Sequence, residues 1–162
     1  MEFSMIRLDA DTLTQDHFDQ LFLLEQDCGL DPYPPEVLLE CVVDLETFGC
    51  FEGEKLLGFI TTHYSSRYLN GSVYIINLNV RRSARRQGIA TALLHHICQY
   101  YHSRHSRRAV SLDVGKTNAG ALALYRKLGF RELGIPSRNG KSDMVMAVPL
   151  AQLLISTSKK QT

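Results

Sequence analysis

The sequence predicts a mixed α/β domain, because strand-like and helix-like segments alternate along the chain. Short β-branched and apolar runs indicate strands, and the run SVYIINLNV at 72–80 is typical of a central strand. Between these runs apolar side chains recur at helical spacing, and turn residues separate the segments. Such an order interleaves sheet and helices in one core. We expect one domain over 1–150 and a tail at 151–162 without a recognisable packing pattern.

In the first half of the chain, two helices are expected to separate an opening strand from a pair of strands. Phe18, Leu21 and Phe22 share one face of a helix, and Pro35 suits the first turn of the next helix. A turn around Gly53 then joins two extended runs. The expected elements are a strand at 3–8, helices at 16–27 and 35–45, and strands at 47–54 and 55–66.

In the second half, strands and helices follow one another singly. Asn70-Gly71 is a hairpin-turn signal, Asn118 can cap a helix after Thr117, and Gly129 stands at the usual C-terminal glycine position of that helix. Another helix starts near Gly88 and carries one apolar face, formed by Ala90, Leu93, Leu94, Ile97 and Tyr101. The expected strands span 72–80, 109–114, 130–135 and 143–150, and the expected helices span 119–128 and the segment after 88.

Composition and charge exclude several classes of function. A net charge of +1 gives no global attraction to nucleic acid, and no apolar run approaches the roughly 20 residues that cross a bilayer. The first residues lack the layout of a signal peptide, so we expect a cytoplasmic protein without nucleic-acid or membrane partners. The cysteines have neither zinc-site nor disulfide-framework spacing, and we expect no metal. They are Cys28, Cys41, Cys50 and Cys98.

A basic loop between the central strand and the next helix indicates an anion-binding site. The first N–H groups of a helix have no intrahelical partner, and the helix dipole favours negative charge there. Gly88 lets the backbone approach an anion, and Arg85 and Arg86 add donors that match phosphate oxygens. A P-loop and a Rossmann dinucleotide site are disfavoured, because the loop has neither GxxxxGK[ST] nor GxGxxG. On the loop alone, a surface loop with solvated arginines stays open.

Two segments together resemble the GNAT superfamily of N-acetyltransferases. Residues 85–90 (RRQGIA) match the pattern [R/Q]-x-x-G-x-[G/A], and 117–130 (TNAGALALYRKLGF) look like N-x-x-A-x-x-L-Y-x-K-L-G-F. The resemblance covers about 46–150 well. It implies the GNAT fold, with a mixed central sheet of about six to seven strands, about four flanking helices, and a V-shaped split between the strands at 72–80 and 109–114.

The resemblance also implies acetyl-CoA as the acyl donor. Its pyrophosphate would rest on loop 85–90, its pantetheine would pair with the end of the central strand, and Asn118 would contact it. One departure from the family is Arg82, where many members have proline; this affects loop stiffness more than chemistry. The residues expected to bind acetyl-CoA are Leu78, Asn79, Val80, Arg85, Arg86, Gln87, Gly88, Ile89, Ala90, Thr91 and Asn118.

Two residues are candidates for proton transfer. By resemblance, Tyr125 would donate a proton to the departing thiolate; alternatively, its place in an apolar helical stripe would make it a core residue. Asp113 is the carboxylate nearest to where a base is needed, and the subgroup that acetylates protein N-termini commonly has Glu there. The alternative for Asp113 is a strand-end residue that holds a loop.

The acceptor is the least defined part of the prediction. Residues 23–40 look like the acceptor-groove region of the ribosomal-protein alanine acetyltransferase subgroup, and Glu25 and Tyr33 are the candidates there. The segment 134–143 is shorter than the loop of that subgroup and lacks its Tyr-Tyr-Pro. Transfer to a protein or peptide N-terminus is favoured, while a small amine or a non-catalytic acyl-CoA-binding domain stays open. We expect a monomer or homodimer.

Overall fold

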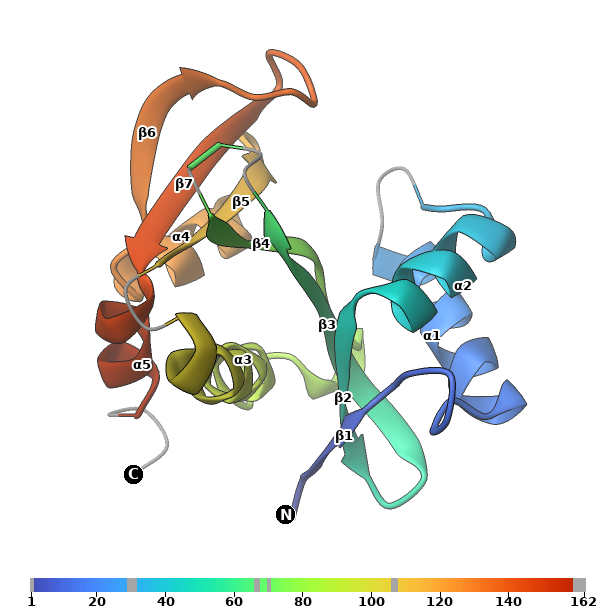
Figure 1. The fold of residues 1–162 in the computed structure, drawn as a ribbon. Helices are drawn as coiled ribbons and strands as arrows, with labels where there is room; N and C mark the ends of the chain where they lie inside the picture. The colour runs from blue at the N-terminus through green and yellow to red at the C-terminus, as the bar shows by residue number, and fades with distance from the viewer. Residues whose placement is uncertain (1, 29–31, 66–67, 70, 106–107, 159–162) are drawn as a thin grey trace. The chain divides into compact units, whose positions relative to one another are not determined.

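The computed structural model describes residues 2–28, 32–65, 68–69, 71–105 and 108–158. Within these ranges seven strands and four α-helices follow one another in the expected order, and a fifth helix comes after the last strand, which confirms the α/β class (Figure 1). Asn70 of the predicted turn lies outside the described residues, as do 29–31, which belong to the predicted acceptor region.

The strands are β1 Ser4–Arg7, β2 Glu46–Glu52, β3 Lys55–Ser65, β4 Ser72–Val80, β5 Ala109–Gly115, β6 Arg131–Pro136 and β7 Asp143–Pro149. The helices are α1 Gln15–Cys28, α2 Pro35–Asp44, α3 Ile89–His105, α4 Ala119–Lys127 and α5 Leu150–Ser158, with a 3₁₀ turn, η1, at Arg82–Ala84.

The strands form one mixed sheet in the order β1-β2-β3-β4-β5-β7-β6. Strands β4 and β5 are parallel, with Val73 opposite Val110 and Ile75 opposite Leu112. A parallel pair needs a long crossover, and α3 lies in the segment that joins these two strands. The pairs β1–β2, β2–β3, β5–β7 and β6–β7 are antiparallel.

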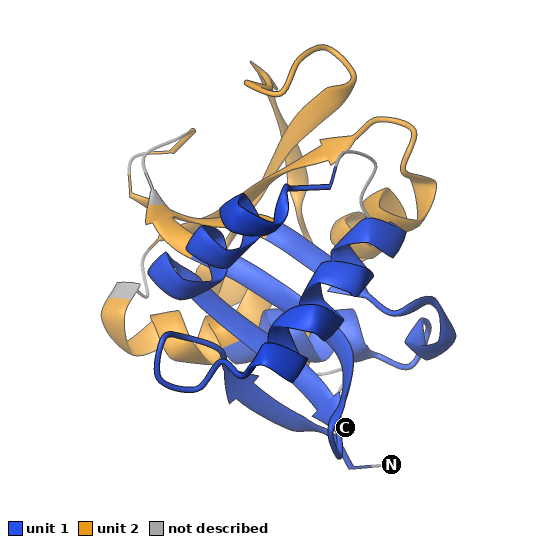
Figure 2. Cartoon of the chain, turned by 90° about the vertical axis from the view of Figure 1, so that its right-hand side faces the viewer, with its two compact units in different colours: residues 1–62, 77–96 blue, residues 63–76, 97–162 orange. Residues whose placement is uncertain are grey.

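The chain divides into two compact units (Figure 2). Unit 1 comprises the described residues of 1–62 and 77–96, and unit 2 those of 63–76 and 97–162. In unit 1, the Gln20 side chain of α1 accepts a hydrogen bond from the Leu56 backbone N–H at 2.8 Å and donates to the Glu54 carbonyl at 3.0 Å. These contacts join α1 to the β2–β3 turn over a buried apolar core. Its members are Leu8, Leu21, Leu24, Leu38, Val42, Phe51, Leu56 and Phe59.

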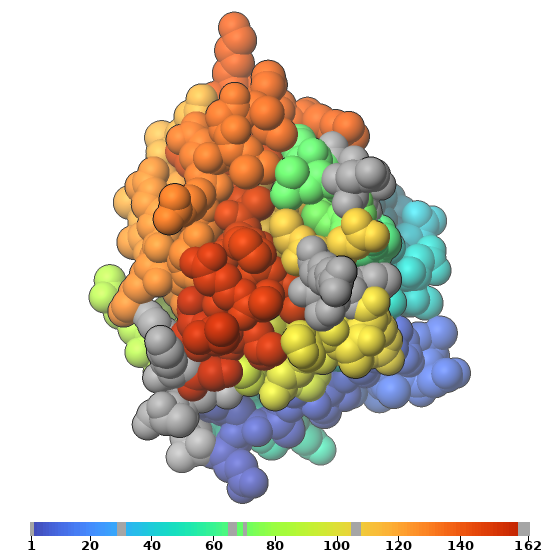
Figure 3. Space-filling model, turned by 60° about the vertical axis from the view of Figure 1, so that its left-hand side comes forward, coloured from blue at the N-terminus to red at the C-terminus, as the bar shows by residue number. Residues whose placement is uncertain are grey.

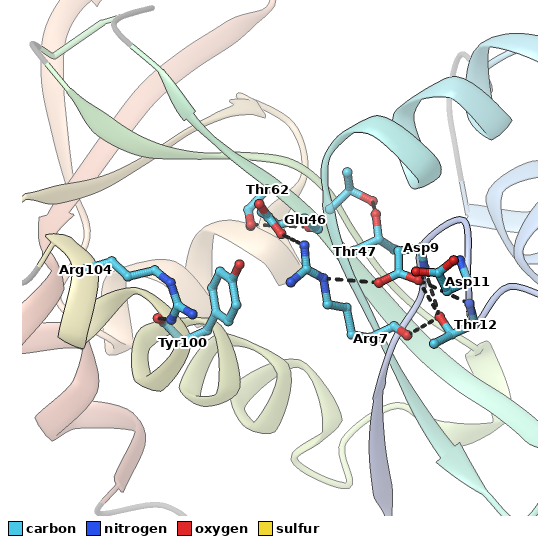
Figure 4. Close-up of polar contacts among 10 residues, drawn as sticks. Arg7, Asp9, Asp11, Thr12, Glu46, Thr47, Thr62, Tyr100 and Arg104 are labelled. Carbon is cyan, nitrogen blue, oxygen red and sulfur yellow. Dashed lines mark hydrogen bonds and ion pairs between the residues drawn. The ribbon is translucent and has the colours of Figure 1, made fainter.

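A surface cluster ties β1 to β2 in unit 1 (Figure 4). The Arg7 guanidinium donates to the Glu46 carboxylate at 2.5 Å and lies 3.7 Å from Asp9. The Asp9 carboxylate also accepts from the Asp11 backbone N–H, which lowers the pKa of Asp9. All three side chains are partly exposed, so solvent screens the ion pairs and they contribute little to stability.

Helix α5 is an element that the sequence did not predict. In unit 2, Leu150, Leu153 and Thr157 are buried on one face of it, while Ile155 is exposed. It follows β7 directly and lies at the surface beside the C-terminal part of α3 (97–105) (Figures 1 and 3). Residues 159–162 lie outside the described part of the chain. Among the described helices, none combines the length and apolar character that a bilayer crossing requires.

Candidate functional site

The predicted anion-binding loop has a backbone conformation suited to that role. It lies in unit 1, between η1 and the first residue of α3, Ile89. Arg86 has φ +61° and Gly88 has φ +80°. Left-handed residues of this kind turn successive backbone N–H groups toward one concavity, where they can bind an anion. Because the Ala92 N–H donates to the Gly88 carbonyl at 2.9 Å, the N–H groups before it stand at the open start of the helix.

Space is available at this loop for a bound group. A Cβ added to Gly88 would meet no described atom within 4 Å. Arg85, Arg86 and Gln87 are exposed, whereas Ile89 and Thr91 are buried. Ile89 and Thr91 therefore anchor the helix start in the core, and what they can offer a ligand is backbone N–H. Ala90 is half-buried.

The end of β4 is joined to this loop by the Arg85 side chain. Its Nε donates to the Val80 carbonyl at 3.1 Å, and its Nη2 lies 3.5 Å from the Cys28 sulfur. The Cys28 thiol in turn donates to the same Val80 carbonyl at 3.6 Å. These contacts hold the loop, the strand end and the end of α1 in one arrangement within unit 1.

Strands β3 and β4 approach closely beside the predicted pantetheine-binding residues. A Cβ at Gly58 would lie 2.8 Å from the Asn79 carbonyl oxygen, so any residue larger than glycine would push the strands apart. Leu78 and Val80 are half-buried in β4. The Asn79 side chain leaves the strand toward α1 and donates to the Glu25 carboxylate at 2.5 Å.

Glu25 is a buried carboxylate, with 3% of its surface exposed. Burial raises its pKa, and hydrogen bonds from the Asn79 side chain and the Tyr33 backbone N–H oppose part of that shift. Tyr33 packs half-buried against the apolar core of unit 1. The structure thus brings both predicted acceptor residues together and links them to β4 through Asn79.

In unit 2, Asp113 of β5 accepts hydrogen bonds from three hydroxyl groups. Oδ1 accepts from Tyr68 at 2.6 Å and from Ser137 at 2.5 Å, and Oδ2 accepts from Tyr74 of β4. The three donors come from the β3–β4 connection, from β4 and from the β6–β7 loop. A strand-end carboxylate therefore organises three separate segments.

The β6–β7 loop is attached to this cluster by its backbone as well. The Arg138 N–H donates to the Tyr68 hydroxyl at 2.9 Å, and the Asn139 N–H donates to the Ser137 hydroxyl at 3.0 Å. The Arg138 guanidinium also lies 5.7 Å from the centre of the Tyr68 ring. The short loop at 134–143 is consequently held by Asp113 and Tyr68.

Sequence reasoning missed Tyr68, Tyr74 and Ser137. Tyr74 could have been found from the parallel register, because Ser111 lies opposite it and Asp113 follows on the same face of β5. Tyr68 and Ser137 belong to connections whose course no local pattern predicts.

The remaining two predicted residues lie at opposite ends of α4 in unit 2. Asn118 is the N-cap, and its side-chain oxygen accepts from the Ala121 N–H at 3.2 Å. Tyr125 is 8% exposed, and its ring centre lies 5.2 Å from that of Phe130. Burial raises the pKa of Tyr125 to about 12, and the phenol, which is protonated at neutral pH, can donate as well as accept a hydrogen bond. Both alternatives, proton donor and core residue, are compatible with this environment.

A family model and individual relatives both relate this chain to acetyltransferases. A model of the acetyltransferase (GNAT) family matches residues 10–130. The ribosomal protein bS18-alanine N-acetyltransferase of Escherichia coli K12 is 30% identical over 119 residues, which cover 65% of this chain and 80% of that protein. An N-alpha-acetyltransferase of Sulfurisphaera tokodaii is 32% identical over 80 residues, 48% of each chain.

Solved structures show the same fold. The ribosomal-protein-S18-alanine N-acetyltransferase from Escherichia coli superposes with a TM-score of 0.73 at 23% identity, covering 93% of this chain and 95% of that one. NAA60 of Arabidopsis thaliana in complex with acetyl-CoA gives a TM-score of 0.70 at 21% identity, with 91% and 98% covered. At this identity the structural likeness establishes the fold.

Proposed function

Because this chain belongs to the acetyltransferase (GNAT) family, we propose that it transfers the acetyl group of acetyl-CoA to the α-amine of a protein or peptide N-terminus. The observation that carries the proposal is the start of α3, where the left-handed Arg86 and Gly88 and the open helix N–H groups make an anion-binding concavity. This geometry suits the pyrophosphate of the acyl donor. The bound acetyl-CoA of NAA60, at 21% identity, supports the same donor here.

The choice of an α-amine is supported by the relatives and by acid–base energetics. The curated relatives carry names that specify N-terminal alanine or N-alpha acetylation. An α-ammonium group costs only about 1 kcal/mol to deprotonate at pH 7, whereas a lysine ammonium costs about 4.6 kcal/mol. A carboxylate such as Asp113, which reaches an acceptor only through hydroxyl groups or water, suits the easier deprotonation.

In the proposed reaction the neutral amine attacks the thioester carbonyl carbon. A C–N bond forms, the carbonyl electrons move to oxygen, and the collapse of this intermediate breaks the C–S bond. The proton lost by the amine ends on Asp113, by way of a hydroxyl in its cluster or a water. The thiolate of CoA receives a proton from Tyr125, whose phenol is protonated at neutral pH, and the proton held by Asp113 then returns through solvent to Tyr125, which restores both groups.

The test measures release of free CoA thiol with matched acceptors. One panel contains peptides with free N-termini, a second contains the same sequences with acetylated N-termini and an internal lysine, and a third contains polyamines and aminoglycosides. We expect turnover with the first panel alone. Turnover confined to the third panel would show that the acceptor is a small amine and not a peptide. Acetyl-CoA binding without turnover in any panel would indicate an acyl-CoA-binding domain instead.

A further inference from the structure

The charged residues of this protein are divided unevenly along the chain. Residues 8–54 hold 13 of the 17 Asp and Glu residues and none of the 18 Lys and Arg residues. Helices α1 and α2 both lie in this segment, and seven of these acidic residues belong to them. Such a division creates a local field of one sign, although the net charge of the whole chain is only +1.

The outer faces of α1 and α2 carry most of this negative charge at the surface of unit 1. Both helices pack their inner faces on one apolar core, together with Phe51 of β2 and Phe59 of β3. Their outer faces therefore point to solvent on the same side of these strands (Figures 1 and 2). We call these faces the α1–α2 surface. Its exposed acidic residues are Asp16, Asp19, Asp27, Glu36, Glu40 and Asp44.

Most of these carboxylates have no cationic partner. Asp27 lies 3.5 Å from the Arg82 guanidinium. The other five form no ion pair with any residue in the described part of the chain. On α2, Glu36, Glu40 and Asp44 also follow one another at i,i+4 spacing, where like charges destabilise a helix. A cationic partner would replace this repulsion by attraction.

The same surface exposes three apolar side chains. Leu23 is 67% exposed, Leu39 43% and Val37 36%, and they are half of the large apolar side chains exposed among the described residues. Lys and Arg have aliphatic stems that cover apolar surface while the charged head stays in water. A surface that mixes carboxylates with apolar side chains therefore fits a basic peptide segment better than an anion or a purely apolar partner.

We propose that the α1–α2 surface docks a Lys- and Arg-rich segment of the acceptor protein, downstream of the N-terminus that is acetylated. The inference rests on the proposed function and names the class of acceptor. The surface overlaps residues 23–40, which the sequence predicts as the acceptor region. Helix α1 has 14 residues and is therefore about 21 Å long, a length that about six residues of an extended chain span.

The first test varies the charge of the acceptor. Three peptides share the same free N-terminal tetrapeptide and continue with six residues in which Ser alternates with Lys, with Gln or with Glu. We expect kcat/KM to fall in this order, by about three- to tenfold from the Lys to the Gln peptide, mainly through KM. The difference should shrink below about twofold when salt rises from about 50 to about 500 mM. Equal kcat/KM for the Lys and Gln peptides would overturn the proposal.

The second test asks whether this preference arises on the α1–α2 surface. Glu36→Gln/Asp44→Asn removes two exposed carboxylates and keeps the shape of both side chains. Glu2→Gln/Glu132→Gln makes the same change of charge at exposed positions outside the surface and is the matched control. We expect the first variant to lose the preference for the Lys peptide and the control to keep it. An equal loss in both variants would overturn the assignment to this surface.

A binding measurement tests the surface without turnover. The Lys peptide with an acetylated N-terminus and a fluorescent label should bind the native protein, and its Kd, measured by anisotropy, should rise about three- to tenfold in Glu36→Gln/Asp44→Asn but not in the control. An unchanged Kd would overturn the docking surface. If this binding is intact but the native protein acetylates no peptide, the proposed function is refuted and the docking surface stands.

The same variants also test whether a second copy of this chain occupies the surface. Sedimentation velocity of the native protein should show no concentration-dependent dimer that Glu36→Gln/Asp44→Asn dissociates. Such a dimer would show that the surface binds another copy of the protein, and it would overturn the assignment to a basic segment of the acceptor.

Discussion

The Ser137 hydroxyl oxygen lies 2.5 Å from Oδ1 of Asp113. This bond joins the β6–β7 loop to β5, and the Tyr68 hydroxyl donates to the same oxygen at 2.6 Å. The two alternatives that the sequence left open for Asp113 are thus not exclusive. Asp113 holds the loop, and this role leaves room for the proposed role as a base.

Ser137→Ala should loosen this loop. The substitution removes a hydrogen bond to a carboxylate and also the acceptor of the Asn139 N–H. We expect the free energy of unfolding to fall by about 1–2 kcal/mol, as measured by urea denaturation. Ser156→Ala is the control, because Ser156 is a half-buried residue of α5 whose hydroxyl donates to its own helix backbone, at the Gln152 carbonyl. Equal stability of the two variants would show that the Asp113–Ser137 bond does not hold the loop.

Gly88→Asp should weaken acetyl-CoA binding through charge. No described atom lies within 4 Å of the new Cβ, so the change creates backbone strain at φ +80° rather than a clash. Gly88→Asn is the matched control, since Asn has the same shape and a comparable left-handed strain without the charge. We expect the Kd of acetyl-CoA, measured by calorimetry, to rise at least about tenfold more for Asp than for Asn. Equal affinities would refute the pyrophosphate assignment of loop 85–90.

Local sequence patterns predicted most of the helices and strands. Helical spacing, Pro35 and the glycine and asparagine caps predicted α1 to α4, and β-branched runs predicted the strands. The sequence did not predict helix α5. Its buried positions are Leu150, Leu153 and Thr157, and this short face includes a polar residue, so it lacks a clear apolar periodicity. Its formation depends on the surface that the rest of unit 2 offers, which no local pattern encodes.

In the candidate site, too, the sequence predicts residues of local motifs and does not predict residues that come together only in the fold. Residues 85–90 and Tyr125 could be recognised because each motif is contiguous in the chain. The hydroxyl cluster around Asp113 could not, since it assembles from a parallel strand register and two connections. The environment of Asn77 could not be predicted for a different reason. Only the folded structure shows that its side-chain donor is buried and has no partner among the described residues. The functional roles themselves remain predictions.

Tyr125→Phe distinguishes a proton donor from a core residue. The ring and its packing on Phe130 are kept, and only the hydroxyl is lost. General acids typically contribute about 10²–10⁴-fold, so we expect kcat to fall at least about a hundredfold with the Kd of acetyl-CoA unchanged. An unaltered kcat would show that Tyr125 is a core residue and not the proton donor.

The same variant tests the environment of the phenol. The folded-state pKa of about 12 lies above the value of about 10 in the unfolded chain, so the folded protein holds this proton more tightly. The resulting stability is fully present below pH 10 and is lost as pH rises toward 12. We expect Tm to fall more between pH 9 and 11 for the native protein than for Tyr125→Phe. Parallel curves would show that the hydroxyl is not desolvated.

Glu25→Gln should show the same relation to pH at a buried carboxyl group, in a lower pH range. Burial raises the pKa of Glu25, so the folded protein binds this proton more tightly than the unfolded chain does. The free energy of unfolding therefore falls as pH rises from about 4 through the folded-state pKa. Gln carries no charge and can still accept from Asn79 and the Tyr33 N–H through its side-chain oxygen.

We accordingly expect Glu25→Gln to be more stable than the native protein at pH 7, with the difference shrinking as the pH falls toward 4, in urea denaturation across that range. Glu40→Gln, at an exposed position of α2, is the control for a general change of charge. A pH-independent difference would mean that burial does not destabilise the charged form of Glu25. If Glu25 receives the acceptor's ammonium group, the stabilised variant should also lose kcat/KM for free-N-terminus peptides, because Gln has no charge to pair with that group.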